Sequence, residues 1–155
     1  MAAVVTASDS RQAIDDVSGT MLVGLLIAMG AEVTTRRIVT DDLESIRETL
    51  YELAIREDVN LLLTSGGTGF SARDNTPEAT LAVIEREAPG IAEAIRRESA
   101  KKTPTAMLSR GVAGIRGNTL IINFPGSPKG VAECFEIIKP ILHHAIDLIS
   151  GKTGH

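Results

Sequence analysis

A glycine-rich segment flanked by hydroxyl side chains is the part of this sequence whose residue types are best suited to chemistry. Three glycines stand within four positions, at Gly66, Gly67 and Gly69. Glycine lets the backbone adopt positive φ and approach a ligand closely. Hydroxyl side chains surround these glycines, at Thr64, Ser65, Thr68 and Ser71. Because the segment leads from an apolar run into the start of a helix, it predicts a loop that binds an anion such as phosphate.

The alternative is a tight strand-to-helix turn without a ligand, although one glycine would serve that purpose. The segment lacks the Gly-Lys-Ser/Thr ending of a Walker A loop. It also lacks the Gly-x-Gly-x-x-Gly spacing of dinucleotide-binding folds. The pattern therefore predicts a class of ligand and no particular nucleotide.

Acidic residues are the next candidates, and Asp74, at the end of this segment, is a possible magnesium ligand. Arg73 and Asp74 end the glycine-rich segment, and Asp41 and Asp42 follow a separate apolar run. Each aspartate also lies near an expected helix start, where a carboxylate stabilises the helix dipole. The pattern alone favours that structural interpretation for Asp41 and Asp42, and their position after a strand keeps the functional one open.

Further polar candidates are Ser8 after the first strand, Ser109 with Arg110 before an apolar strand, and Lys129 after the turn residues Pro125, Gly126 and Ser127. Ser109-Arg110 also fits a surface turn, and Lys129 fits either a solvated helix start or a phosphate contact. His143 and His144 are adjacent on an expected helix, so they point in different directions and do not form a metal pair.

Composition restricts the class of protein. A chain of 155 residues with 43% hydrophobic residues fits a single domain, residues 1–155, with a real core. Aromatic residues make up only 3% of the chain and Trp is absent, which argues against a nucleic-acid module that stacks bases. The net charge of −4 is spread along the chain, so we expect no nucleic-acid partner.

Cysteine use and the first residues indicate the compartment. Cys134 is the single cysteine and cannot form an internal disulfide, and its apolar neighbours favour a core position. The first residues lack the basic start and apolar stretch of a signal peptide, and no uncharged run is long enough to cross a bilayer. We therefore expect a soluble cytoplasmic protein with no membrane partner.

Strand and helix patterns alternate along the chain. Strands are expected over Ala2–Ala7, Ala31–Val39, Val59–Thr64, Val112–Ile115 and Thr119–Phe124. Helices are expected over Gly19–Met29, with a cap at Asp16 or Ser18, and over Leu43–Leu53. A third helix is expected to run from an N-cap at Thr76 to Glu87, and a fourth over Ile91–Ala100 after a break at Pro89-Gly90. The last helix is expected over Gly130–Ser150, with a kink at Pro140.

This order predicts a single-domain α/β fold. Helices would cover both faces of a doubly wound, mainly parallel sheet and so form three layers. In such folds the ligand-binding loops follow the carboxyl ends of the strands. The loops at residues 8–16, 40–42, 65–75 and 125–129 are therefore expected to meet at one edge and form one pocket.

Six segments in the same order resemble the molybdopterin adenylyltransferase family, which includes the bacterial Mog proteins and the G domains of plant Cnx and gephyrin. The matching segments are Ser8-Asp9-Ser10, Thr64 to Phe70, Arg73-Asp74 with Thr76 to Thr80, Met107 to Arg110, Gly114 to Gly117, and Leu120 to Asn123 followed by Pro125 to Ser127. The resemblance extends over nearly the whole chain. The resemblance implies the molybdopterin-binding, MogA-like fold and a homotrimer.

The resemblance also implies Mg²⁺-dependent transfer of AMP from ATP to the terminal phosphate of molybdopterin, with pyrophosphate as the second product. By position, Asp41 and Asp74 match the family's catalytic, metal-binding aspartates. Ser109 matches a serine implicated in handling molybdopterin. The remaining residues expected to line the substrate pocket are Ser8, Ser65, Gly66, Gly67, Thr68, Gly69, Pro125, Gly126 and Ser127.

Two departures from the family pattern leave questions open. Thr40 stands where the family commonly has Pro, so a shift of one residue would make Asp42 the counterpart in place of Asp41. Asn75 replaces the small apolar residue usual after Arg-Asp. The alternative functions are a molybdopterin-binding paralogue without catalysis, an oligomeric scaffold of the same fold, and a nucleotide-cleaving role like that of domains in competence-damage-type proteins.

Overall fold

The structure is a computed structural model that describes residues 1–10 and 15–152. Within these residues, six strands form one sheet in the order β2-β1-β3-β6-β5-β4. β1, β2, β3 and β6 run parallel, and β5 and β4 are added antiparallel at one edge. The strands are β1 (Ala2–Ala7), β2 (Val33–Val39), β3 (Leu61–Ser65), β4 (Arg86–Glu87), β5 (Ala113–Arg116) and β6 (Thr119–Phe124).

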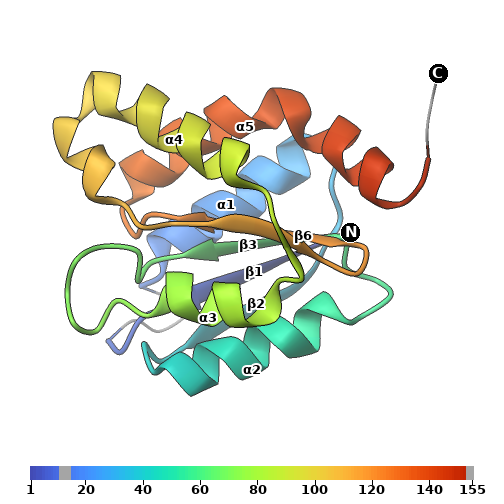
Figure 1. The fold of residues 1–155 in the computed structure, drawn as a ribbon, viewed down its shortest axis with the longest axis horizontal. Helices are drawn as coiled ribbons and strands as arrows, with labels where there is room; N and C mark the ends of the chain where they lie inside the picture. The colour runs from blue at the N-terminus through green and yellow to red at the C-terminus, as the bar shows by residue number, and fades with distance from the viewer. Residues whose placement is uncertain (11–14, 153–155) are drawn as a thin grey trace.

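Helices cover both faces of the sheet and produce the three predicted layers. One face carries α1 (Val17–Ala28), α4 (Pro89–Lys102) and α5 (Pro128–Ile149), and the other carries α2 (Leu43–Ala54) and α3 (Thr76–Val83) (Figure 1). β1 and β3 are buried along their whole length, which explains their continuous apolar sequences. Successive side chains alternate between the two cores: Val4 packs in the cluster under α1, α4 and α5, and Val5 in the cluster under α2 and α3. The predicted doubly wound, mainly parallel α/β fold is confirmed.

Polar side chains determine where three of the helices begin. Asp16 caps α1, Asp42 caps α2 and Ser127 caps α5, each by accepting a hydrogen bond from the amide three residues later. Of the two caps predicted for α1, Asp16 is therefore the observed one. The predicted cap of α3 was wrong, because Asn75 occupies the N-cap position and Thr76 is the first helical residue.

The chain after α3 differs most from the prediction. The prediction that the helix beginning near Thr76 continues to Glu87 was wrong, because α3 ends at Val83. The following residues form β4 instead, since the amides of Glu85 and Ala88 each donate to a backbone oxygen of β5 at 2.8 Å. The predicted break at Pro89 is the start of α4, where proline fits because the first helical amides have no partner within the helix.

The other boundaries differ from the prediction by one or two residues. β1 and β6 have their predicted bounds, whereas β2 and β3 begin two residues later than predicted. α1, α4 and α5 begin two residues earlier, and α5 continues through Pro140 as one helix. A short 3₁₀ helix, η1 (Pro104–Leu108), connects α4 to β5. No helix in the described part of the chain has the length and apolar character needed to span a membrane.

Candidate functional site

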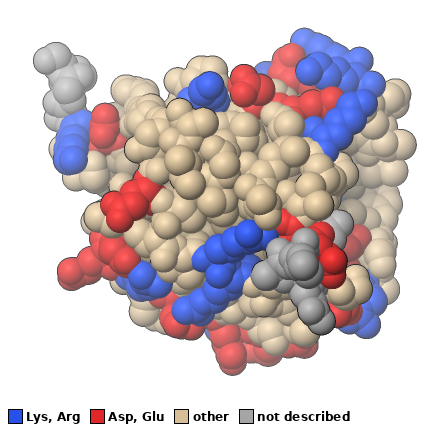
Figure 2. All heavy atoms as spheres, turned by 180° about the vertical axis from the view of Figure 1, so that it is seen from behind, with Lys and Arg blue, Asp and Glu red and all other residues tan. Residues whose placement is uncertain are grey.

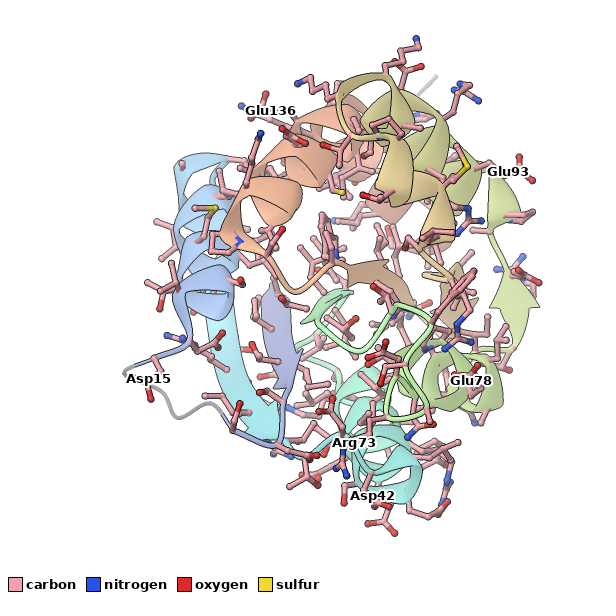
Figure 3. The ribbon with its side chains drawn as sticks, turned by 90° about the vertical axis from the view of Figure 1, so that its left-hand side faces the viewer. Asp15, Asp42, Arg73, Glu78, Glu93 and Glu136 are labelled. Carbon is pink, nitrogen blue, oxygen red and sulfur yellow. The ribbon has the colours of Figure 1, made fainter. Side chains whose placement is uncertain are left out.

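The described residues of the polar loops meet at the edge of the sheet where β1, β2, β3 and β6 all end, as Figure 3 shows from that side. The Ser8 amide donates to the Val39 backbone oxygen at 2.8 Å, which joins the loops after β1 and β2. The Ser65 hydroxyl donates to the Pro125 backbone oxygen at 3.0 Å, which joins the loops after β3 and β6. Ser65 is fully buried, so its hydroxyl acts as a brace between two loops.

Positive φ angles require glycine at Gly66 and Gly67 in the loop after β3, and Gly69 leaves room for the Asp74 carboxylate. Gly66 and Gly67 adopt positive φ angles of 92° and 69°. A Cβ atom at Gly66 would lie 2.6 Å from the Ala7 backbone oxygen, and one at Gly67 would lie 2.4 Å from a side-chain oxygen of α3. Gly69 does not adopt positive φ, but a Cβ there would lie 2.9 Å from the Asp74 carboxylate. Gly69 therefore allows the Asp74 carboxylate to lie close to the loop backbone and is not needed for a positive φ angle.

Backbone amides of this loop are available to a ligand. In the described parts of the chain, the amides of Gly67, Thr68 and Gly69 donate no hydrogen bond to the protein. The buried Thr76 hydroxyl beside Gly67 also has no partner there. Polar groups withdrawn from water without a partner cost free energy. An anionic ligand at the loop would accept hydrogen bonds from the amides, which is the predicted chemistry of this segment.

Asp74 stands at the end of the glycine loop, and Arg110 holds the backbone on both sides of it. The Asp74 carboxylate accepts a hydrogen bond from the Ser71 amide at 3.0 Å and remains partly exposed. The Arg110 guanidinium donates to the Gly69 and Asp74 backbone oxygens at 2.8 Å each and pairs with Glu78. Arg110, for which the sequence left both a surface turn and a functional role open, therefore holds the backbone of the loop on both sides of Asp74.

The two aspartates after β2 have different roles. The Asp42 carboxylate accepts hydrogen bonds from the amide and the hydroxyl of Ser45 at 2.9 Å each, which lowers its pKa. Burial, and then the negative charge of Asp74, raise the pKa of Asp41. The carboxylate that experiences the charge of Asp74 is thus Asp41, whereas Asp42 is occupied as a helix cap.

Asp41 and Asp74 together suit a divalent cation. Among the described residues, no group of three or more Cys, His, Asp or Glu side chains is placed to hold a metal ion. Mg²⁺ is commonly bound by only one or two carboxylates, with water and substrate phosphates completing its shell. A cation held by the pair would also offset the negative charge of Asp74, which is the smaller of the two causes, after burial, that raise the pKa of Asp41. The donor set therefore fits Mg²⁺ that arrives with a phosphate ligand.

Asp9 connects the loop after β1 to Asp41 in the loop after β2 and to Arg73 in the loop after β3. The sequence did not identify this role. Its carboxylate accepts a hydrogen bond from the Asp41 amide at 2.8 Å, and the Asp41 carboxylate accepts one from the Asp9 amide at 3.2 Å. Arg73 forms an ion pair with Asp9. These contacts join residues far apart in the sequence, so no local pattern indicates them.

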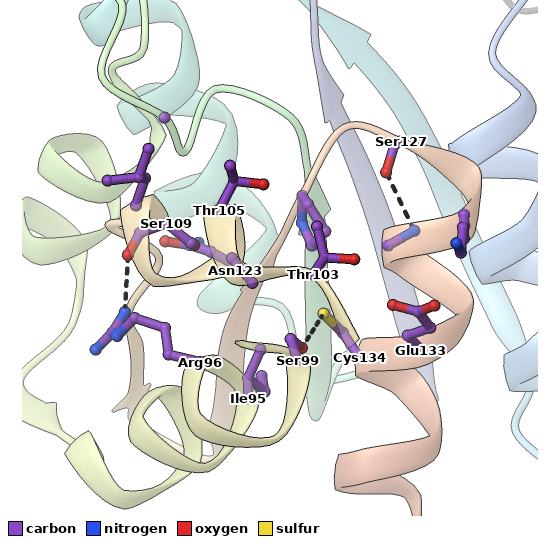
Figure 4. Close-up of a pocket in the computed structure, with 16 residues that line it drawn as sticks. Ile95, Arg96, Ser99, Thr103, Thr105, Ser109, Asn123, Ser127, Glu133 and Cys134 are labelled. Atoms are coloured by element: carbon purple, nitrogen blue, oxygen red, sulfur yellow. Dashed lines mark hydrogen bonds between the residues drawn. The ribbon is translucent and has the colours of Figure 1, made fainter. Parts of the chain in front are cut away.

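A cavity of about 460 Å³ lies on the other side of the glycine loop, between β6, α4, η1 and the start of α5 (Figure 4). The candidates named from the sequence that line it are Gly69, Ser109, Pro125, Ser127 and Lys129. Arg96 donates to the Ser109 and Gly111 backbone oxygens at 3.3 and 2.7 Å and so holds this segment in place. Gly69 lines this cavity, and a Cβ atom at Gly69 would lie 2.9 Å from the Asp74 carboxylate, so the glycine loop lies between the cavity and Asp74.

Three further residues support the walls of this site. The Gly126 backbone oxygen accepts a hydrogen bond from the Ser18 hydroxyl at 2.6 Å, which anchors the loop after β6 to α1. Asn123, which the sequence did not single out, is buried and donates to hydroxyl groups of β3 and α3 at 3.0 and 2.9 Å. Cys134 is buried as predicted, and burial raises the pKa of its thiol.

Comparisons match the chain to a molybdopterin-binding family and to several proteins of molybdopterin or molybdenum cofactor synthesis. The sequence profile of a family described as "Probable molybdopterin binding domain" matches residues 3–144. The chain is 44% identical over 154 residues to the molybdenum cofactor synthesis protein cinnamon of Drosophila melanogaster, spanning 97% of this chain but only 26% of that protein. It is 40% identical over 153 residues to the molybdopterin adenylyltransferase of Helicobacter pylori strain J99, spanning 96% of this chain and 87% of that protein. The crystal structure of the molybdopterin biosynthesis enzyme MoaB from Thermus thermophilus has a TM-score of 0.89 and 44% identity, covering 97% of this chain and 96% of that one.

Proposed function

The chain belongs to the family of probable molybdopterin binding domains, and on this basis we propose that it is a molybdopterin adenylyltransferase of molybdenum cofactor biosynthesis. In the proposed reaction, a terminal phosphate oxygen of molybdopterin attacks the α-phosphorus of ATP. The bond from the α-phosphorus to the oxygen that bridges to the β-phosphorus breaks. The products are adenylylated molybdopterin and pyrophosphate.

The observation that carries this proposal is the placement of Asp41 and Asp74 beside a loop of open amides. Burial, and after it the negative charge of Asp74, raise the pKa of Asp41. Both carboxylates come from the carboxyl edge of the sheet, where doubly wound folds bind their ligands. A phosphate held by the amides of Gly67 to Gly69 would lie next to a cation held by the two carboxylates.

The residues of the site suit phosphoryl transfer without a general base. The attacking phosphate is already anionic, so the barrier consists mainly of charge repulsion and positioning. When bound, Mg²⁺ supplies positive charge that offsets the negative charge of the ATP phosphates. Asp41 and Asp74 would hold this ion, and the loop amides would orient phosphate oxygens. The cavity beside Ser109 would take molybdopterin.

The first test is the reaction itself. Purified protein with ATP, Mg²⁺ and molybdopterin is expected to release one pyrophosphate for each adenylylated molybdopterin detected by mass spectrometry. Omission of Mg²⁺ or of molybdopterin should stop the release. If calorimetry detected molybdopterin binding but no ATP-dependent pyrophosphate appeared, the protein would instead be a binding paralogue and the proposed activity would be wrong.

We propose that the protein assembles as a homotrimer through an uncharged face of α1. This helix contains no charged residue, yet Val17 and Ile27 are 57% and 58% exposed. Gly24 lies between them with open space where a side chain would be, so a partner can approach the helix closely. Figure 2 shows a broad area without charged side chains on the back of the molecule. Large apolar side chains that remain exposed on an uncharged helix, such as Val17 and Ile27, are typical of an interface between proteins.

Ile27→Arg is expected to convert the trimer into a monomer in sedimentation velocity experiments. The substitution places a charge on a surface that would be withdrawn from water in the assembly, which is costly without a partner. Ile55→Arg is the matched control, because Ile55 is also 56% exposed but lies at the end of α2, on the other face of the sheet. A trimer that survives Ile27→Arg would contradict this interface.

A further inference from the structure

Asn75 makes a hydrogen bond that its position in the chain does not predict. It is the N-cap residue of α3, where an Asn side chain usually accepts a hydrogen bond from the helix's own amides. Its side chain makes no such bond. The Asn75 amide nitrogen instead donates to the Asp41 backbone oxygen at 2.9 Å, across 34 residues of sequence.

This bond joins the two segments that carry the candidate metal ligands. Asp74 directly precedes Asn75 in the chain. The same short segment therefore carries the Asp74 carboxylate and binds the backbone of Asp41. Asp41 follows β2 and Asp74 follows β3, and β1 lies between these strands in the sheet. Ladder hydrogen bonds therefore do not link the two segments directly. Their separation depends on contacts between the loops.

The other contact between these loops is weaker. Arg73 pairs with Asp9, which in turn bonds to the Asp41 backbone amide. The Arg73 side chain is 69% exposed, and ion pairs between exposed side chains contribute little because solvent screens them. The Asn75 bond is partly buried and reaches Asp41 without an intermediate residue.

We propose that Asn75 is a positioning residue of the metal site, whose amide fixes Asp41 relative to Asp74 and thereby sets the affinity for Mg²⁺. This inference rests on the proposed function, since it assigns a role within the same site. Side chains that orient metal ligands through a hydrogen bond typically change metal affinity by about 10- to 100-fold when they are removed. Asn75 acts through the backbone of Asp41 and not by direct contact with the reacting atoms.

The test compares Asn75→Leu with the wild type. Leu has a similar size but cannot donate a hydrogen bond, and Asn75→Ala is a second variant that adds no bulk. Asn118→Leu is the matched control, because Asn118 is an exposed residue in the turn between β5 and β6, remote from the carboxylates. The probe is Mn²⁺, whose binding is followed by electron paramagnetic resonance with a non-hydrolysable ATP analogue present. The Mg²⁺ dependence of pyrophosphate release and the melting temperature are measured in parallel.

We expect Asn75→Leu and Asn75→Ala to weaken Mn²⁺ binding by about tenfold and to raise the half-saturating Mg²⁺ concentration by a similar factor. The kcat at saturating Mg²⁺ and the melting temperature should stay close to the wild-type values, because no helix cap is lost. Asn118→Leu should leave every measurement unchanged. Unchanged Mn²⁺ affinity in both Asn75 variants would overturn the proposal, and a lower melting temperature with unchanged affinity would assign a structural role instead.

The same experiment separates this inference from the proposed function. A wild-type protein that releases no pyrophosphate but binds Mn²⁺ would refute the adenylyltransferase activity. The difference in Mn²⁺ affinity between wild type and Asn75→Leu would still decide the role of Asn75. Conversely, an active wild type with identical Mn²⁺ binding in all variants would refute only the role of Asn75.

Discussion

Asp74→Asn is expected to lower the rate of pyrophosphate release by at least about a hundredfold with the fold intact. The side-chain oxygen of Asn can still accept the hydrogen bond from the Ser71 amide, which is 3.0 Å long in the wild type. The negative charge that would hold Mg²⁺ is lost. Loss of one electrostatic element that stabilises a transition state typically costs about 10²- to 10³-fold in kcat. A continuous pyrophosphate assay measures the rate, and a thermal melt checks that the fold is intact.

Two comparisons make the Asp74 result specific. Asp147→Asn removes an exposed carboxylate near the end of α5, and its rate should equal that of the wild type. Asp74→Ala removes the bond to Ser71 as well as the charge, so it should be at least as inactive as Asp74→Asn. Full turnover by Asp74→Asn would show that this carboxylate is not part of the reaction, and the proposed mechanism would then fail.

The architecture could be predicted because its signals are local. The continuous apolar runs of β1 and β6 identify strands covered on both faces, and both strands have their predicted bounds. β4 carries no such signal, because Arg86 and Glu87 favour helices by intrinsic propensity. Only the pairing of this segment with β5, through the backbone oxygens of Ala113 and Ile115, makes it a strand. Tertiary contact therefore overrides local propensity at this point.

The candidate site was predictable in its loops and not in the contacts between them. The glycines after β3 form a local pattern, so a loop with positive φ angles at this point could be predicted from residue types alone. The choice between Asp41 and Asp42 depends on backbone geometry: Asp42 has an extended conformation, with φ −63° and ψ 128°, which lets it cap α2. The bond from Asn75 to Asp41 links separate loops, and no spacing rule anticipates it.

Asp16→Ala is expected to reduce the free energy of unfolding by about 3 kcal/mol, the lower end of the cost of breaking a buried ion pair. Asp16 is fully buried and accepts hydrogen bonds from the Thr6 hydroxyl at 2.7 Å, the Gly19 amide at 3.0 Å and the Arg36 guanidinium at 3.1 Å. The substitution removes the cap of α1 and leaves a partly buried Arg36 without its counter-ion. Urea denaturation measures the loss. Asp15→Ala, at the exposed neighbouring position, should change the free energy by less than about 0.5 kcal/mol.

The difference in stability between the wild type and Asp16→Asn, measured as a function of pH, separates the contribution of the Asp16 charge from that of its shape. Burial pushes the pKa of Asp16 up, but the hydrogen bonds from Thr6, Gly19 and Arg36 outweigh it, so the pKa lies below 3.8. The stabilisation from such a carboxylate is fully present above the pKa of the unfolded chain and is lost as pH falls through the folded pKa. The wild type should therefore exceed Asp16→Asn in stability at neutral pH, and this advantage should disappear in strong acid. A difference that stayed constant between neutral and strongly acid pH would show that Asp16 stabilises the fold by its shape, and that its charge contributes nothing.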